Sequence, residues 1–189
     1  MKTAFVIFNG MTVMDFIGVY DPLTRLKSMQ LMPNFEWDIC SLTERVDDGK
    51  GLRITPSVVG RPLCDYDLLV VPGGFGTRAL QYDQTFLSWL RTSEPVALKA
   101  SVCTGSLLLG AAGFLKTRRA TTHPTAFEAL KQYCAEVVDH RVVEDGEIIT
   151  ARGVTSAIDL GLYLVERLAG TDARARIATQ MDFPYEREE

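Results

Sequence analysis

The chain has 189 residues, a formal net charge of −4 at pH 7, 47% hydrophobic residues and 23% charged residues. This length and composition are typical of one soluble globular domain with a sizeable core, so we expect a single domain over 1–189. The acidic balance gives no basic patch for nucleic acid, and no apolar run reaches membrane-spanning length. The N-terminus has no signal-peptide layout, so we expect a cytoplasmic protein without a nucleic-acid or membrane partner.

The cysteines and histidines are few and far apart. There are four cysteines, none in a C-x-x-C pair, and two histidines. This distribution argues against a zinc site and gives no disulfide framework. We therefore expect reduced thiols and no metal.

The first third of the chain predicts strands on either side of a helix. A short apolar run over 2–8 indicates a buried parallel strand, and 35–42 alternates as a second strand. An apolar helical segment over 15–29 lies between them, and Pro22 predicts a break or kink in it. Residues 52–59 are typical of hairpin material.

The remaining segments continue the alternation of strands and helices. The pattern predicts strands over 67–71, 96–102, 120–122, 137–143 and 147–150, and helices over 83–92, 124–133, 156–168 and 171–178. A further apolar helix is expected directly after Cys103, with Gly113 near its end as a candidate C-cap. This order indicates an α/β fold with a doubly wound, mostly parallel sheet and helices on both faces. Ligands bind outside the carboxyl ends of such strands, where 9–15, 72–76 and 102–105 are expected to converge.

Cys103 stands where a strand-like segment becomes a helix. Its small neighbours Ser101 and Gly105 suit a sharp turn that holds the central residue in strained geometry, with its side chain clear of both elements. At a helix N-terminus the free N–H groups favour a thiolate, which predicts a nucleophile. The alternative is a cysteine that packs in the core as a small hydrophobe.

Asp15 and the glycine loop Pro72–Gly76 are the other candidates. Asp15 could cap its helix or serve as a general acid/base facing Cys103, and a carboxylate beside a thiolate raises at least one pKa. The loop lacks both phosphate-binding glycine patterns. Instead, the N–H groups of Gly74 or Phe75, with that of Thr104, could stabilise negative charge on a substrate. The same loop adds Gly73 to the candidate substrate-binding residues.

His123 and His140 could each form a cysteine–histidine pair with Cys103. Neither is near Cys103 in the sequence, although contact in space is possible. A partly exposed structural histidine is the favoured interpretation for both.

Several stretches together resemble the ThiJ/PfpI superfamily, which is related to class I glutamine amidotransferases. The stretches are 14–18, 72–74, 101–106, 111–115, 118–123 and 153–159. The segment around Cys103 resembles the branch that contains isocyanide hydratase, and also the sensor domain of AraC-type regulators. The resemblance spans almost the whole chain, and Val154 joins the candidate substrate-binding residues through the last stretch.

The resemblance implies a flavodoxin-like sheet, a homodimer, and a site in which Cys103 is the nucleophile. Asp15 would be its acidic partner and Thr104 would complete the site. The peptidase-like and glyoxalase-like branches usually carry histidine after the cysteine, where this chain has Thr104. In the branches where a glutamate is the acidic partner of the cysteine, the loop after the first strand supplies that glutamate, whereas this chain has Asp15. Both departures favour the hydratase branch.

The leading hypothesis is hydration of a small isocyanide to an N-substituted formamide, with no cofactor. Two alternatives stay open at this point. One is a glyoxalase-like or amidase-like enzyme acting on small carbonyl compounds through the same thiolate. The other is a non-catalytic sensor, because an exposed cysteine of low pKa oxidises readily.

Overall fold

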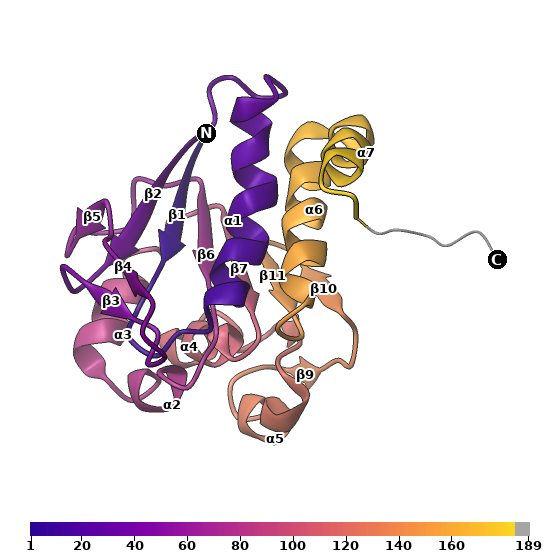
Figure 1. Ribbon diagram of the computed structural model, residues 1–189. Coiled ribbons are helices and arrows are strands. Elements are labelled where there is room, and N and C mark those ends of the chain that lie inside the picture. Colours follow the sequence, from indigo (N-terminus) through magenta and orange to yellow (C-terminus); the bar gives the residue numbers. More distant parts are fainter. Residues whose placement is uncertain (184–189) are drawn as a thin grey trace.

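The computed structural model describes residues 1–183, and a seven-stranded sheet runs through its centre (Figure 1). The strand order is β10-β11-β7-β6-β1-β2-β5, and all neighbours are parallel except the antiparallel pair of β10 and β11. The strands are β1 (Lys2–Val6), β2 (Glu36–Ser41), β5 (Val58–Val59), β6 (Leu68–Val71), β7 (Leu98–Val102), β10 (Val142–Asp145) and β11 (Ile148–Ala151). The prediction of a doubly wound, mostly parallel sheet is confirmed.

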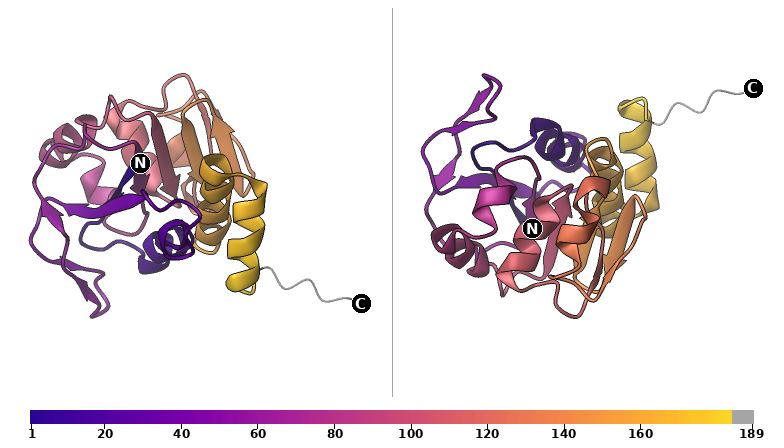
Figure 2. Two further views of the ribbon diagram at one scale, coloured as in Figure 1. Left: turned by 90° about the horizontal axis from the view of Figure 1, so that it is seen from above. Right: turned by 90° about the horizontal axis from the view of Figure 1, so that it is seen from below.

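Helices cover both faces of this sheet, which explains why its central strands are almost wholly buried. Figure 2 shows α1 (Val13–Ser28), α6 (Ser156–Ala169) and α7 (Thr171–Gln180) on one face. The other face carries α3 (Gln84–Arg91) and α4 (Gly105–Ala112). All four residues of β6 are buried, as are the last four of β1 and β7. Within residues 1–183, no helix is long and apolar enough to cross a bilayer.

The short elements differ more from expectation. The segment over 46–59 divides into a hairpin of β3 (Val46–Asp47) with β4 (Arg53–Ile54), and β5, which joins the edge of the main sheet. The segment expected as one helix over 124–133 is a 3-10 turn, Pro124–Ala126, followed by α5 (Phe127–Leu130). A second small sheet pairs β8 (Arg119–Ala120) with β9 (Glu136–Val137), and α2 (Thr77–Leu80) was not expected.

The predicted break at Pro22 is wrong, because α1 continues through it as one helix. Here α1 packs against α6 along a seam of small residues. A Cβ added at Gly18 would lie 2.6 Å from the Cβ of Ala157, and one at Gly161 would lie 2.8 Å from the Pro22 ring. The close packing of the two helices therefore holds the proline in the helix despite its missing backbone hydrogen bond.

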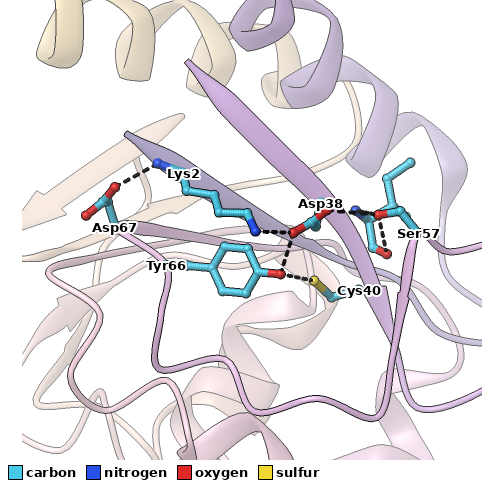
Figure 3. Close-up of polar contacts among 7 residues, drawn as sticks. Lys2, Asp38, Cys40, Ser57, Tyr66 and Asp67 are labelled. Atoms are coloured by element: carbon cyan, nitrogen blue, oxygen red, sulfur yellow. Dashed lines mark hydrogen bonds and ion pairs between the residues drawn. The ribbon is translucent and has the colours of Figure 1, made fainter. Parts of the chain in front are cut away.

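A cluster of polar side chains ties together β1, β2 and the segment before β6 (Figure 3). Lys2 Nζ lies 2.7 Å from Asp38 Oδ2, and the Tyr66 hydroxyl donates to the same oxygen at 2.8 Å. The Lys2 backbone N–H donates to Asp67 at 2.7 Å. Burial of Asp38 favours its neutral form, but the hydrogen bonds from Lys2 and Tyr66 outweigh it, so the pKa of Asp38 lies below its usual value.

We expect Asp38→Asn to lower the free energy of unfolding by about 1–2 kcal/mol at pH 7, since it weakens hydrogen bonds to a charged group. Because folding lowers the Asp38 pKa, its stabilising effect is present above the unfolded pKa of about 4 and is lost as pH falls through the folded value. Urea unfolding of both proteins at pH 7 and pH 3 should therefore give a difference that shrinks at low pH. Glu44→Gln at an exposed position is the control, and a difference independent of pH would contradict the assignment.

Candidate functional site

The three segments expected at the carboxyl ends of the strands do converge there. Met11 pairs with Gly74 in an isolated β-bridge, and the Thr12 N–H donates to the Gly73 carbonyl at 2.8 Å. The Gly74 N–H donates to the Thr104 hydroxyl at 3.0 Å. These bonds join the loops after β1, β6 and β7 into one continuous surface.

Cys103 occupies the expected strained turn between β7 and α4. Its φ of +55° lies in the left-handed region, which residues other than glycine rarely adopt. The Cys103 N–H donates to the Ala151 carbonyl at 2.9 Å, and its own carbonyl accepts from the Thr122 hydroxyl at 2.9 Å. A Cβ at Gly105 would lie 2.3 Å from the Val71 carbonyl oxygen, so the turn requires glycine there. The surrounding structure thus fixes a backbone conformation that is unfavourable by itself.

Asp15 is fully buried in the first turn of α1 and does not cap that helix. Its Oδ2 accepts the Gly73 N–H at 3.0 Å, and Oδ1 has no hydrogen-bond partner within residues 1–183. The Cys103 thiol lies beside the same carboxyl group. Burial raises the pKa of Asp15 to about 7, although the Gly73 N–H and the thiol both favour the carboxylate. This carboxyl group can therefore hold or release a proton near neutral pH.

Burial of the Cys103 side chain opposes the thiolate that the helix N-terminus was expected to favour. This side chain is almost fully buried, with 6% of the residue exposed. Burial and the charge of Asp15 raise the Cys103 pKa to about 12, while hydrogen bonds from the Thr104 N–H and hydroxyl lower it. The predicted coupling of Asp15 to Cys103 is present, and the Asp15 charge adds to the effect of burial in raising the Cys103 pKa.

The glycine loop does not offer all the N–H groups that the sequence suggested. The Gly73 N–H is bonded to Asp15 and the Gly74 N–H to Thr104, so neither is available to a ligand. Within residues 1–183, the N–H groups of Phe75 and Thr104 have no backbone acceptor. A Cβ at Gly73 would lie 2.6 Å from the Thr104 nitrogen, 2.8 Å from the Cys103 Cβ and 2.9 Å from Asp15 Oδ2. Glycine at 73 therefore allows the loop to approach the thiol and the carboxyl group.

A cavity of about 390 Å³ opens above the thiol. Of the candidate residues, it is lined by Gly74, Phe75, Cys103, Thr104 and Val154. Asp15 and Gly73 are buried next to the sulfur and are not part of this lining. Within residues 1–183, no group of three or more His, Cys, Asp or Glu side chains could hold a metal ion. The cavity suits a small organic molecule placed against the Cys103 sulfur.

Apart from Thr12, in the segment 9–15 expected at the site, and His123, weighed as a partner of Cys103, the rest of the lining was not expected from the sequence. It consists of Thr12, Thr77, Arg78, Gln81, Leu107, His123, Thr125, Ala126 and Ala129. His123 was weighed as a partner of Cys103, but its Nδ1 accepts the Thr125 N–H at 3.3 Å and lies 2.8 Å from the Thr125 hydroxyl. That arrangement is the capping role of a structural histidine, on the cavity wall. His140 does not line the cavity.

The architecture and the sequence both match known proteins. The DJ-1/PfpI family model matches residues 1–167. The chain is 34% identical to the isonitrile hydratase of Pseudomonas putida, over 97% of this chain and 78% of that protein. It is 30% identical to the glutathione-independent glyoxalase DJR-1.2 of Caenorhabditis elegans, over 70% of this chain and 72% of that protein. A ThiJ/PfpI family crystal structure from Pseudomonas syringae superposes with a TM-score of 0.87 at 31% identity, covering 100% of this chain and 77% of that one.

We expect Asp15→Asn to speed the alkylation of Cys103 by iodoacetamide at pH 8–9. The Asp15 charge raises the Cys103 pKa, so its removal increases the thiolate fraction. Alkylation can be followed peptide by peptide with mass spectrometry, and the exposed Cys64 in the same sample is the internal control. An unchanged rate at Cys103, with Cys64 unaffected, would show that the carboxyl group does not control the sulfur, and a slower rate would show that Asp15 acts on the sulfur as a base and not through its charge.

Proposed function

The chain belongs to the DJ-1/PfpI family, and from this premise we propose that it hydrates a small isocyanide to an N-substituted formamide. The observation that carries the proposal is a fully buried carboxyl group with a pKa of about 7 beside a thiol at the floor of a cavity. Thr104 follows the cysteine and bonds to both the N–H and the carbonyl of Gly74. The 34% identity to an isonitrile hydratase supports the same reaction class.

In the first half of the reaction, Cys103 adds to the terminal carbon of the isocyanide. The Asp15 carboxylate takes the thiol proton as the sulfur–carbon bond forms. Asp15 then delivers that proton to the same carbon, which gives a thioimidate, R–N=CH–S, bound to Cys103. One isocyanide has been added to one S–H group, and Asp15 is a carboxylate again.

In the second half, water adds to the thioimidate carbon. Asp15 accepts a proton from the water and passes it to the nitrogen as the C=N bond opens, which gives a tetrahedral adduct with one hydroxyl and one N–H group. The C–S bond of this adduct then breaks, Asp15 transfers the hydroxyl proton to the sulfur, and the product leaves as R–NH–CHO. The net change is one isocyanide plus one water to one formamide, and no cofactor takes part.

The raised pKa values suit this sequence of proton transfers. A carboxyl group with a pKa of about 7 can act as base and acid in alternate steps at neutral pH. A thiol of high pKa gives a strongly nucleophilic sulfur once its proton is removed in place. The Thr104 N–H and hydroxyl lower the cost of charge on that sulfur. Thr104 is therefore proposed to position the loop and stabilise the developing thiolate.

A glyoxalase-like reaction on 2-oxoaldehydes is the second candidate, favoured by the 30% identity to a glyoxalase. Product analysis on a mixed panel of isocyanides and 2-oxoaldehydes separates the two reactions. The sensor alternative is less well supported, because a cysteine with 6% exposure and a raised pKa is not the accessible thiolate that oxidises readily. The homodimer and the cytoplasmic location stay predictions.

We expect Cys103→Ala to abolish formamide formation from an aryl isocyanide, because no nucleophile remains. Asp15→Asn should lower kcat/KM by about 10²–10⁴-fold, the range for loss of a general acid/base. Formamide is quantified by chromatography, with circular dichroism to check folding. Cys64→Ser, at an exposed cysteine outside the cavity, is the matched control. Full activity in Cys103→Ala would end the proposal.

The pH profile of kcat/KM should report Asp15. The active free enzyme carries an Asp15 carboxylate and a Cys103 thiol, which coexist between about pH 7 and about pH 12. The rate should therefore be low at pH 5, rise to half its plateau near pH 7 and stay level to pH 9. Initial rates in a constant-ionic-strength buffer series test this. A flat profile from pH 5 to pH 9 would be inconsistent with Asp15 as the base.

A further inference from the structure

Arg78 is the only arginine or lysine among the residues that line the cavity, and no Asp or Glu is among them. Within residues 1–183, the Arg78 side chain has no ion pair and no hydrogen bond. Other arginines, such as Arg118 and Arg152, pair with nearby carboxylates. Arg78 is exposed and lines the cavity, so it offers there a guanidinium group whose donors are not used by the described part of the protein.

The guanidinium is held in place by an aromatic ring. Its central carbon lies 4.4 Å from the centroid of the Phe75 ring. Phe75 is 74% exposed, which is unusual for a phenylalanine. Stacking restricts the long arginine side chain and leaves the N–H groups along its edge free to bind an anion. Phe75 thus has a role as a platform that positions Arg78 at the cavity.

The other polar groups near Arg78 cannot neutralise it. Gln81 donates to the Arg78 carbonyl at 3.3 Å and accepts from the Tyr133 hydroxyl at 3.2 Å, so both ends of its amide are engaged. His123 Nδ1 accepts the Thr125 N–H, so a neutral ring carries its proton on Nε2 and is a further donor. The wall thus combines cationic and donor groups with no anionic partner.

The remaining wall is apolar, formed in part by Leu107, Ala126, Ala129 and Val154. We propose that the site selects substrates with a carboxylate on an apolar body, and that Arg78 is the specificity-determining residue that binds this carboxylate. This inference rests on the proposed function and narrows its substrate class to isocyano acids. Arginine binds a carboxylate through two parallel hydrogen bonds, which a neutral ester does not reproduce.

The test compares 4-isocyanobenzoate with its methyl ester, which share the aryl body and differ in charge. Wild-type protein should favour the acid in kcat/KM. Arg78→Gln should lower kcat/KM for the acid by about 10- to 100-fold, mainly through a higher KM, and leave the ester unchanged. Arg78→Lys should recover part of the loss, because lysine restores the charge without the planar pair of donors.

Two further variants sharpen the result. Phe75→Leu should raise the KM for the acid more than the KM for the ester, since it removes the ring that positions Arg78. Arg176→Gln, on the exposed face of α7 and outside the cavity, makes the same charge change and should leave kcat/KM unchanged for both substrates. The inference is overturned if wild-type protein favours the ester, or if Arg78→Gln slows acid and ester equally.

Binding of the hydration products separates this inference from the proposed function. If neither isocyanide is consumed, the proposed reaction fails, but calorimetry with 4-formamidobenzoate and its methyl ester on Cys103→Ala protein still decides the role of Arg78. Carboxylate recognition is supported if Cys103→Ala protein binds the acid more tightly than the ester and the Cys103→Ala/Arg78→Gln double variant does not. Equal binding of acid and ester, or no binding of either, overturns it.

Discussion

The left-handed backbone at Cys103 is the constraint on which the site depends. A non-glycine residue with φ of +55° is stable only because its neighbours hold it, through the Ala151 carbonyl on one side and the Thr122 hydroxyl on the other. This conformation places the sulfur at the cavity floor, and Gly105 lets α4 start directly against the Val71 carbonyl. The loop after β6 supplies Gly74, which bonds to Thr104. The first turn of α1 supplies Asp15, which lies beside the sulfur.

Burial, and not the helix N-terminus, decides the protonation state of the site. A helix N-terminus stabilises an anion by about 0.3–1 kcal/mol, less than the roughly 1.4 kcal/mol of one pKa unit. Burial together with the Asp15 charge raises the Cys103 pKa from 9.0 to about 12. The larger effect is burial, which favours the protonated sulfur and also raises the pKa of the neighbouring Asp15 carboxyl group to about 7. Such a pair is arranged to move one proton between two atoms.

The sequence predicted the fold and the central pair well, because both depend on local patterns. Buried strand runs, the small residues around Cys103 and the positions of strand ends are local features, and the structure brings Asp15, Cys103 and Thr104 together as expected. The protonation of Cys103 was not predictable, because it depends on solvent exclusion by distant segments. The availability of the Gly74 N–H was misjudged for a similar reason, since its acceptor, the Thr104 hydroxyl, comes from another loop.

Pro22 and the unexpected α2 also show that local sequence patterns do not predict features that depend on distant segments. The intrinsic preference of proline predicts a break, but the packing of α1 on α6 outweighs it. The four-residue α2 is too short to give a helical period, so Arg78 could not be placed at the cavity from sequence.

The small-residue seam between α1 and α6 has a consequence for the chemistry at the other end of α1. Asp15 lies one turn before Gly18, whose Cα is pressed against Ala157. A bulkier side chain at that crossing would push the two helices apart and carry the carboxyl group away from the sulfur. A misplacement of about 1 Å can slow a reaction about 100-fold. Residues outside the cavity, at the crossing of α1 and α6, thus help to set the distance between the Asp15 carboxyl group and the Cys103 sulfur.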